Sequence, residues 1–256
     1  MTRVIVVANQ KGGVSKTTSV QNIAASLDYK GYKTLSVDFD PQGNLSFLMG
    51  ADVNKPTIYD VLRDKANIME TLQHTKSGDI IPANILLSGA DLEFTQTGKD
   101  MLLKNALEIF KSSGYKFILL DTPPSLGILT INALTAADSV IIPMSADVLS
   151  LQGISQLYDT IEAVRRRNNP GLKIEGLLFT QYVARTLLTK EFTKAIKGVA
   201  KRLDTKVFNT AIRISVAARE AQANQTDVIT YAPRSSTADD YNAVTIEIIK
   251  GGSKRG

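Results

Sequence analysis

A glycine-containing segment with two lysines follows the first apolar run of the chain. It reads Asn9-Gln10-Lys11-Gly12-Gly13-Val14-Ser15-Lys16-Thr17-Thr18. Gly12 and Gly13 let the backbone approach phosphate oxygens with its N–H groups turned inward, and the positive end of a following helix adds partial charge. Lys16 is placed to reach β- and γ-phosphates, and the Thr17 hydroxyl is placed to hold Mg²⁺. The segment predicts a phosphate-binding loop, and a plain glycine-rich turn is the competing interpretation.

Carboxylates follow two further apolar runs. Asp38 and Asp40 come after Leu35-Ser36-Val37, and Asp121 ends the run that begins at Lys116. In open parallel sheets ligands bind at the carboxyl ends of the strands, so these side chains are expected beside the loop. A carboxylate at the end of a buried strand suits Mg²⁺, usually through water, which is the role expected of Asp121. For Asp38 and Asp40, a solvated turn at the strand end is the alternative.

Strand-like and helix-like segments alternate along the chain. This alternation predicts an α/β fold, in which helices cover both faces of a mostly parallel twisted sheet. Buried strands are expected at Arg3–Ala8, Thr34–Val37, Phe117–Leu120, Ser139–Ile142 and Ile174–Phe179. Helices are expected at Thr17–Tyr29, Lys99–Ser112, Ile128–Ala137, Leu151–Asn168 and Lys190–Leu203.

A less regular insert runs over residues 44–98, with a short helix expected near Thr57–Arg63 and a strand near Asp79–Pro82. The sequence has no internal repeat and no linker rich in Gly, Pro or Ser. One domain over residues 1–256 is therefore expected, with residues 251–256 as a flexible tail.

The composition excludes several kinds of site. Without cysteine there can be no disulfide, thiolate metal site or cysteine nucleophile, and the single histidine excludes a multi-histidine metal site. No run approaches the roughly twenty apolar residues of a membrane span, and the start lacks a signal-peptide pattern. We therefore expect a cytoplasmic protein. A net charge of +5 weakly favours an acidic partner such as nucleic acid.

The loop differs from the common G-x-x-x-x-G-K-[ST] pattern. Gln10 and Ser15 stand at its two glycine positions, and an additional lysine, Lys11, precedes the glycine pair. In this it resembles the deviant Walker A signature K-G-G-x-x-K-[ST] of the ParA/MinD superfamily, where glycine is most frequent at the position of Ser15.

Other segments extend the resemblance over nearly the whole chain. Asp38-Phe39-Asp40-Pro41-Gln42-Gly43-Asn44 resembles the family motif D-x-D-P-Q-G-N, and Thr122–Gly127 resembles its switch II loop. Leu129–Leu134, Glu175–Leu178 and Tyr231–Ser235 recur in the same order and spacing in the family. The chain is thus identified as similar to the Soj-type ParA partition ATPases, which have the P-loop NTPase fold.

The resemblance implies ATP and Mg²⁺ as cofactors, an ATP-dependent sandwich homodimer, and slow hydrolysis stimulated by a ParB-like centromere-binding protein. It implies that Lys11 reaches the partner's phosphates, that Asp40 orients the attacking water, and that Asp38 supports the magnesium region. For Lys11 the alternative is an exposed lysine without a catalytic role. The implied catalytic residues are Lys11, Lys16 and Asp40; the nucleotide contacts are residues 11–18 with Asp38 and Pro233; the metal ligands are Thr17, Asp40 and Asp121.

The resemblance also implies non-specific binding to double-stranded DNA and association with the nucleoid. Four lysines at i, i+4, i+7 and i+11 fall on one helix face, which suits phosphate contacts without sequence information. An ordinary solvated helix face is the alternative. Arg185 matches a family DNA-binding position, whereas the second family arginine aligns with Ala217, and Arg213 or Arg219 would have to replace it. The expected DNA contacts are Arg185, Lys190, Lys194, Lys197, Lys201, Arg213 and Arg219.

Three other functions compete with this interpretation. A membrane-surface ATPase like MinD needs a basic amphipathic C-terminal helix, and Tyr241–Lys250 carries only two charges, Glu247 and Lys250. A metabolic P-loop enzyme needs a site for a small acceptor, which residues 44–98 could hold. A scaffold that no longer hydrolyses ATP would have no use for both Asp40 and Asp121.

Overall fold

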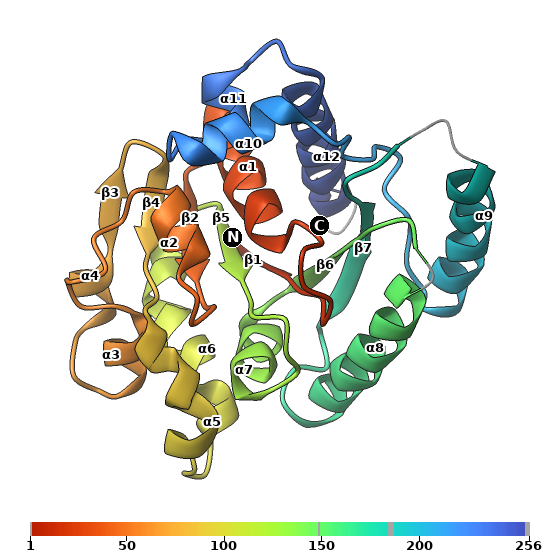
Figure 1. The fold of residues 1–256 in the computed structure, drawn as a ribbon. Helices are drawn as coiled ribbons and strands as arrows, with labels where there is room; N and C mark the ends of the chain where they lie inside the picture. The colour runs from red at the N-terminus through yellow and green to blue at the C-terminus, as the bar shows by residue number, and fades with distance from the viewer. Residues whose placement is uncertain (1, 148, 184–186, 254–256) are drawn as a thin grey trace.

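A sheet of parallel strands forms the centre of the molecule. The structure is a computed structural model, which describes residues 2–147, 149–183 and 187–253. Within these residues seven strands pair in the order β3-β4-β2-β5-β1-β6-β7, and only the edge hairpin β3–β4 is antiparallel (Figure 1). The strands are β1 Arg3–Val7, β2 Thr34–Asp38, β3 Gln73–Thr75, β4 Gly78–Ile81, β5 Phe117–Asp121, β6 Ser139–Met144 and β7 Lys173–Phe179.

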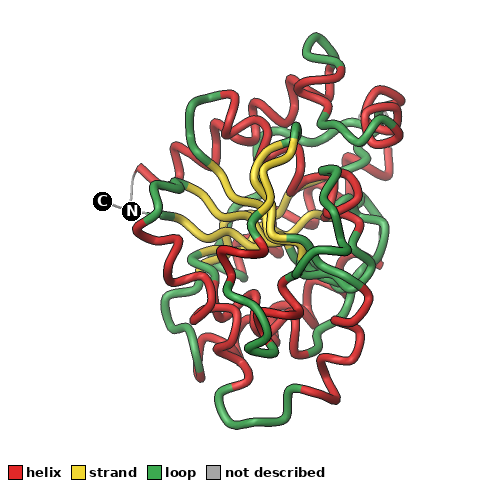
Figure 2. Tube along the Cα trace, turned by 90° about the vertical axis from the view of Figure 1, so that its left-hand side faces the viewer, coloured by secondary structure: helices red, strands yellow, loops and turns green. Residues whose placement is uncertain are grey.

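The central strands are buried on both faces, which explains their continuous apolar sequences. Along β1, Val4 and Val6 belong to one core cluster, and Ile5 and Val7 belong to the other. Helices therefore cover the sheet on both sides, as Figure 2 shows with the strands in yellow between helices in red. The expected α/β fold is confirmed, and each expected strand is found within two residues of its predicted bounds.

Four long helices follow expected segments within about three residues. They are α1 Lys16–Tyr29, α7 Ile128–Ala136, α8 Leu149–Arg167 and α9 Leu187–Arg202. A further long helix, α12 Ser236–Ser253, was not among the predicted helices. The short helices are α2 Asn44–Leu48, α3 Ile58–Leu62, α4 Ile68–Thr71, α5 Ala90–Glu93, α6 Leu102–Leu107, α10 Val216–Ala223 and α11 Val228–Tyr231, and the 3₁₀ turns are η1 Ile85–Gly89, η2 Lys99–Met101 and η3 Glu108–Ser112.

The helix expected over Lys99–Ser112 is wrong as a single element, because it is divided into η2, α6 and η3. The side chain of Asn132, on α7, explains the first division. Its Nδ2 donates to the Lys99 carbonyl at 2.9 Å, and its Oδ1 accepts from Leu103 N at 3.2 Å. An α-helix would join these same two backbone groups directly, so the inserted amide interrupts the helix there.

The strand expected within the insert is present, and the last helix extends into the segment expected to be a tail. Residues 78–81 of the insert form β4, which pairs in parallel with β2 and so belongs to the main sheet. At the other end, α12 runs to Ser253, so residues 251–253 are helical and not part of a flexible tail; residues 254–256 lie outside the described ranges. Among the described residues, none of the helices combines the length and hydropathy needed to cross a membrane.

Candidate functional site

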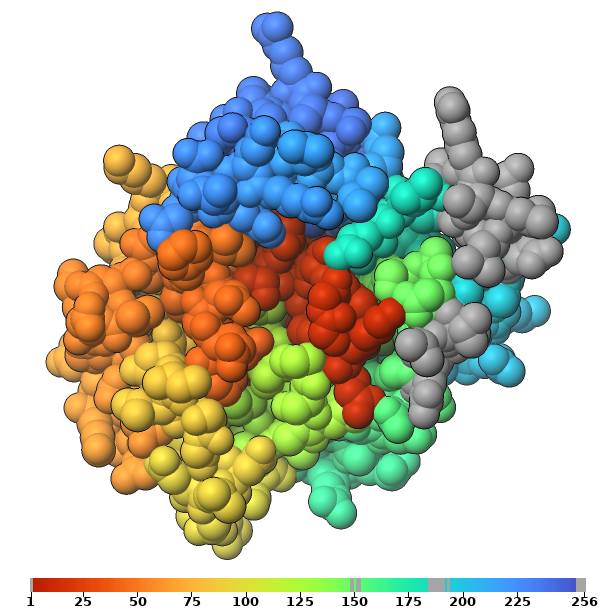
Figure 3. All heavy atoms as spheres, in the orientation of Figure 1, coloured from red at the N-terminus to blue at the C-terminus, as the bar shows by residue number. Residues whose placement is uncertain are grey.

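The phosphate loop connects β1 to α1 at the carboxyl end of the central strands. Its entry is held by Asn9, whose Nδ2 donates to the Pro143 carbonyl at 2.6 Å and whose Oδ1 accepts from Lys11 N at 3.0 Å. In Figure 3 the N-terminal part of the chain, in red, reaches the surface in the middle of one face. The loop is therefore accessible, and its entry is anchored to the neighbouring strand β6.

The backbone conformation of Ser15 is one that glycine adopts more easily than serine. Ser15 precedes α1 in the left-handed conformation, with φ 60° and ψ 34°. This conformation costs a residue with a Cβ atom roughly 1–2 kcal/mol, a cost that glycine avoids. The loop keeps the backbone shape that glycine would adopt, and it carries the strain of a side chain there.

Lys16 is the first residue of α1 and is nearly buried, with 7% of its surface exposed. Its Nζ donates to the Lys11 carbonyl at 3.2 Å, which draws the side chain back over the loop. Burial lowers the pKa of Lys16, while the negative charges of Asp121 and Asp40 oppose that shift. A cation held in this way is suited to bind phosphate oxygens between the loop and the two carboxylates.

Register places the carboxylates of β2 and β5 next to each other, since Asp38 pairs directly with Asp121. Asp38 is fully buried and accepts hydrogen bonds from Asp40 N at 3.1 Å, Ser46 N at 2.8 Å and Ser46 Oγ at 2.7 Å. Burial raises the pKa of Asp38 despite these bonds, and the charge of Asp40 adds to the rise. Asp38 thus acts mainly as an anchor for the turn that presents Asp40.

Asp121 is the buried group without a partner at this site. It is completely buried, and among the described residues neither carboxylate oxygen has a hydrogen-bond partner of regular geometry, although the Thr17 hydroxyl lies close enough to influence it. Burial, followed by the charges of Asp38 and Asp40, raises the pKa of Asp121 well above the ordinary value, although the Thr17 hydroxyl and Lys16 act against the rise. An unpaired buried carboxylate is costly and fits a neighbouring divalent cation.

Magnesium fits these residues as a cofactor shared with the nucleotide. Within the described residues, no group of three or more His, Cys, Asp or Glu side chains could hold a metal ion by itself. Mg²⁺ usually keeps several waters and binds through one or two protein groups together with substrate phosphates. Thr17, Asp40 and Asp121 could supply such groups.

A cleft of about 390 Å³ joins part of the predicted site, whereas Lys11, Val14, Asp38 and Asp121 are not among the residues that line it. Asp40 faces it, and its Oδ1 accepts from Gln42 N at 3.0 Å. A smaller cavity of about 150 Å³ shares Ser15, Thr18 and Gln181 with the cleft, so the two are neighbours. The cleft is lined by Gly12, Gly13, Ser15, Lys16, Thr17, Thr18, Asp40, Gln42, Asn44, Pro124 and Gln181.

Lys11 is bound within its own chain. Its Nζ lies 2.5 Å from Asp147 Oδ2 and 3.2 Å from Ser145 Oγ, on the segment that follows β6. Partial burial works against ionisation, but hydrogen bonds from Lys11, Ser145 and Ser150 lower the pKa of Asp147. Sequence patterns did not single out Asp147, because its contact with Lys11 joins residues that are far apart in the chain.

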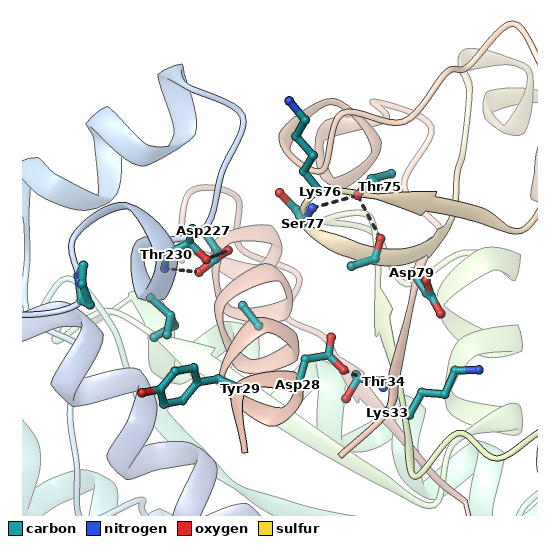
Figure 4. Close-up of a pocket in the computed structure, with 14 residues that line it drawn as sticks. Asp28, Tyr29, Lys33, Thr34, Thr75, Lys76, Ser77, Asp79, Asp227 and Thr230 are labelled. Atoms are coloured by element: carbon teal, nitrogen blue, oxygen red, sulfur yellow. Dashed lines mark hydrogen bonds between the residues drawn. The ribbon is translucent and has the colours of Figure 1, made fainter. Parts of the chain in front are cut away.

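Pro233 is not among the residues that line the phosphate cleft. It follows α11 and lines a separate cavity of about 640 Å³. Figure 4 shows a close-up of that cavity. Asp28, Asp79 and Asp227 also line that cavity, and it includes no residue of the phosphate loop.

Three of the residues expected to contact DNA lie together on helix α9. Lys194, Lys197 and Lys201 are exposed along α9, whose opposite side buries Phe192 and Ile196. Two further positions fall outside what the structure describes: Arg185 lies outside the described residues, and for Lys190 only the backbone, in α9, is described.

The two arginines that were expected to replace a family DNA contact differ in their surroundings. Arg213 donates to Asp240 through Nε at 2.9 Å and Nη2 at 2.6 Å, and to the Ser236 carbonyl at 2.9 Å. Arg219 is exposed on α10. Arg213 is thus already paired within the chain, and Arg219 faces solvent.

Several residues of the site carry no motif and were missed. Gln181 follows β7 and lines the cleft, and Gln222 Nε2 on α10 donates to Thr18 Oγ1 at 2.8 Å. The hydroxyl of Ser46 ties Asp38 to Ala83 N, at 2.9 Å from the latter. These polar side chains come from segments remote in sequence, and no local pattern distinguishes them from surface residues.

Comparison with known proteins identifies relatives that match nearly the whole chain. Residues 2–174 match the family model described as an AAA domain. The chain is 42% identical to sporulation initiation inhibitor protein Soj of Bacillus subtilis, covering 98% of this chain and 100% of that protein. It is 40% identical to chromosome-partitioning ATPase Soj of Treponema pallidum, covering 100% of both chains.

A solved structure is similar over the same extent. It is a cobyrinic acid a,c-diamide synthase from Mycobacterium smegmatis with bound ADP and magnesium. The TM-score is 0.86 at 34% sequence identity, covering 100% of this chain and 97% of that chain. The P-loop NTPase fold is therefore common to the two chains, and the M. smegmatis protein holds ADP and magnesium.

Proposed function

The chain belongs to the Soj/ParA family of partition ATPases, and from this membership we infer that it is an ATP-driven DNA-segregation switch. In this proposal ATP and Mg²⁺ bind in the phosphate cleft, two ATP-bound chains associate face to face, and the dimer binds double-stranded DNA without sequence preference. A ParB-like partner then stimulates slow hydrolysis, which releases the DNA. The protein would act in the cytoplasm, on the nucleoid.

The observation that carries the ATPase proposal is the group formed by Lys16, Asp40 and Asp121. The charges of two carboxylates act on the nearly buried cation of Lys16, and one of them, Asp121, is itself fully buried. Catalysis of phosphoryl transfer is mostly positioning and charge stabilisation, so this arrangement supports nucleotide hydrolysis. Mg²⁺, when bound, would neutralise charge on the phosphates, while Asp40 faces the cleft where it could orient a water molecule.

The accessible position of Lys11 supports association through the phosphate-loop face. Its side chain is 30% exposed, so it can leave Asp147 without rearrangement of the core. A lysine supplied to the partner's phosphates would make hydrolysis depend on the dimer. The notably exposed lysines of α9 support DNA binding, because a stripe of cations contacts phosphates without reading bases.

The direct test is DNA binding by the purified protein with ATP, ADP or no nucleotide, over a range of salt concentrations. We expect binding with ATP and Mg²⁺ to fragments of unrelated sequence, with an affinity that falls steeply as salt increases. Analytical ultracentrifugation with a non-hydrolysable ATP analogue should show the dimer. Binding that is indifferent to nucleotide, or absent at low salt, would rule out the DNA switch.

A second candidate is ATP-dependent amide synthesis, the activity named for the similar M. smegmatis protein. This chain has no cysteine, so it could not release ammonia from glutamine by a thiolate and would need free ammonia. ATP hydrolysis stimulated by a small carboxylic acid and ammonia, and not by DNA and a partner, would favour that activity.

A membrane-surface role like that of MinD is less well supported. The apolar residues Ala238, Tyr241, Val244 and Ile248 of α12 are buried in the core and pack near α1. They are therefore unable to enter a membrane surface without unpacking the core. Vesicle sedimentation with anionic lipids should recover no protein with ATP or without it.

A further inference from the structure

Two consecutive residues at the end of β7 contact backbone carbonyls of the phosphate loop. Gln181 Nε2 donates to the Gly13 carbonyl at 2.7 Å. The Thr180 hydroxyl donates to the Val14 carbonyl at 3.1 Å and shares its single proton with the Met144 carbonyl, at 3.3 Å. Thr180 is fully buried and is itself fixed by its N–H, which donates to the Met144 carbonyl at 2.9 Å. The loop is thus held from β7 through two successive peptide groups.

These contacts decide where two N–H groups of the loop point. In a trans peptide the N–H is directed opposite to the C=O of the same peptide group. Since the Gly13 carbonyl faces Gln181, the N–H of Val14 is turned to the other side, and the Val14 carbonyl does the same for the N–H of Ser15. Neither of these N–H groups donates a hydrogen bond to any residue that the structure describes. Both remain free to donate to an anion.

Gln181 also reaches the strained residue of the loop. Its Nε2 lies 3.3 Å from Ser15 Oγ, in addition to its bond with Gly13. Both residues are in the left-handed region, Ser15 at φ 60° and Gln181 at φ 50°. Such conformations persist in residues other than glycine only where the surroundings hold them. The serine at the usual glycine position and the glutamine after β7 therefore form one local arrangement.

We propose that Gln181, together with Thr180, is a positioning residue that aims the Val14 and Ser15 N–H groups at the phosphates of the bound nucleotide and holds Ser15 in its left-handed conformation. This rests on the proposed nucleotide site. Gln181 acts through the loop backbone and takes no part in the chemical step.

The first test is Gln181→Met, which keeps the length of the side chain and removes its donor. The dissociation constant of Mg²⁺–ADP, measured by titration calorimetry, should rise about fivefold, the size expected from one hydrogen bond. The loop holds phosphate in the ground state and the transition state alike, so KM for ATP should rise while kcat changes less than about twofold. The Tm without nucleotide should stay within about 1 °C of wild type.

Gln225→Met is the matched control. Gln225 is also an exposed glutamine in the left-handed region, at φ 49°, and its Nε2 donates to a backbone carbonyl, that of Phe47, at 3.1 Å. It lines neither the cleft nor the adjoining cavity. Its replacement should leave the affinity for Mg²⁺–ADP unchanged.

A second test combines the change with Ser15→Gly. Glycine adopts the left-handed conformation without strain, so the loop should depend less on Gln181. In the Ser15→Gly background, Gln181→Met should weaken Mg²⁺–ADP binding by less than about twofold. A fivefold loss in both backgrounds would show that the two residues are not coupled and would overturn that part of the proposal.

Thr180 is tested by a pair of substitutions. Thr180→Val keeps the shape and removes the hydroxyl, and it should weaken Mg²⁺–ADP binding; Thr180→Ser keeps the hydroxyl and should restore it. Wild-type protein that does not bind Mg²⁺–ADP would refute the proposed function itself. Wild-type binding that Gln181→Met leaves unchanged, or a loss that appears only with a lowered Tm, would overturn the positioning role alone.

Discussion

The ammonium group of Lys11 lies 2.5 Å from the carboxylate of Asp147 in the same chain. The residue proposed to act on a partner's phosphates is thus engaged within its own chain by a carboxylate and a hydroxyl. Each protomer would have to break this ion pair before its lysine could cross the interface. The strength of the ion pair between Lys11 and Asp147 should therefore affect how readily two chains associate.

Asp147→Asn should favour the ATP-dependent dimer. The change removes the charge that holds Lys11 and keeps an oxygen that can accept from the Ser150 N–H. A partly exposed ion pair is worth about 0.2–1 kcal/mol, and a dimer breaks two of them, so its dissociation constant should fall by about twofold to thirtyfold. Sedimentation velocity with a non-hydrolysable ATP analogue measures this. Glu108→Gln, which breaks an exposed pair with Lys111, is the control, and an unchanged dimer in Asp147→Asn would contradict the prediction.

Asp40→Ala should separate nucleotide binding from hydrolysis. Asp40 lines the cleft, and its carboxylate accepts one hydrogen bond, from Gln42 N, whereas that of Asp38 accepts three. The fold and ATP binding should therefore survive the loss of the Asp40 carboxylate. Loss of the group that orients water should lower turnover by about 100-fold or more. Lys16→Ala, in contrast, should abolish detectable nucleotide binding. Phosphate release and nucleotide titration distinguish the two, and normal turnover in Asp40→Ala would refute the role given to Asp40.

Asp28→Asn should stabilise the protein at neutral pH and have little effect near pH 4. Partial desolvation of this half-exposed carboxylate, with contributions from the charges of Asp79 and Asp227, raises the pKa of Asp28 from 3.8 to about 6, although the hydrogen bond from the Thr34 N–H opposes the rise. The folded state therefore binds a proton more tightly than the unfolded chain, and wild-type stability falls as pH rises from about 4 to 6. Asparagine removes this penalty and can still accept from Thr34 N, at 2.9 Å in the wild type.

The expected gain is about 1 kcal/mol at pH 7.5, since solvent at this exposed side chain screens much of the effect. Urea unfolding at pH 7.5 and at pH 4.0 measures it. Asp52→Asn is a control of opposite sign, because hydrogen bonds from Asn54 lower the pKa of Asp52. An equal gain for Asp28→Asn at both pH values would show that charge is not its cause.

Replacing Lys194, Lys197 and Lys201 together by glutamine should weaken ATP-dependent DNA binding for every sequence tested. Each phosphate contact contributes about 0.9 to the slope of log affinity against log salt, so the slope should become shallower by about 2.7 if all three contact phosphate. Fluorescence anisotropy at several salt concentrations gives the slope. The control replaces Lys55, Lys65 and Lys76, which are exposed elsewhere on the surface, by glutamine. The two triple variants have the same net charge, and the control should change the salt slope less.

The positions of the phosphate loop and of the three carboxylates within the fold were predicted from short stretches of sequence. The phosphate loop lies between a strand and a helix as expected, and Asp38, Asp40 and Asp121 lie at strand ends beside it. These predictions succeeded because strand burial and helix starts depend on neighbouring residues, and parallel pairing brings carboxyl ends together. The division of Lys99–Ser112 was not predictable in this way, because Asn132 that interrupts it lies about 30 residues further along the chain.

By itself, the sequence determined the family, the α/β architecture and the chemical identity of the phosphate loop, since these follow from local patterns of residue type and spacing. Only the tertiary structure decided which groups hold that loop. Asp147 binds Lys11, Gln181 and Thr180 orient the backbone on either side of Val14, and Asp121 remains buried without a partner. Such contacts depend on distances between segments that the chain brings together only when the sheet forms. Ser15 shows both levels: its type is visible in the sequence, whereas its strained backbone and its contact with Gln181 exist only in the folded protein.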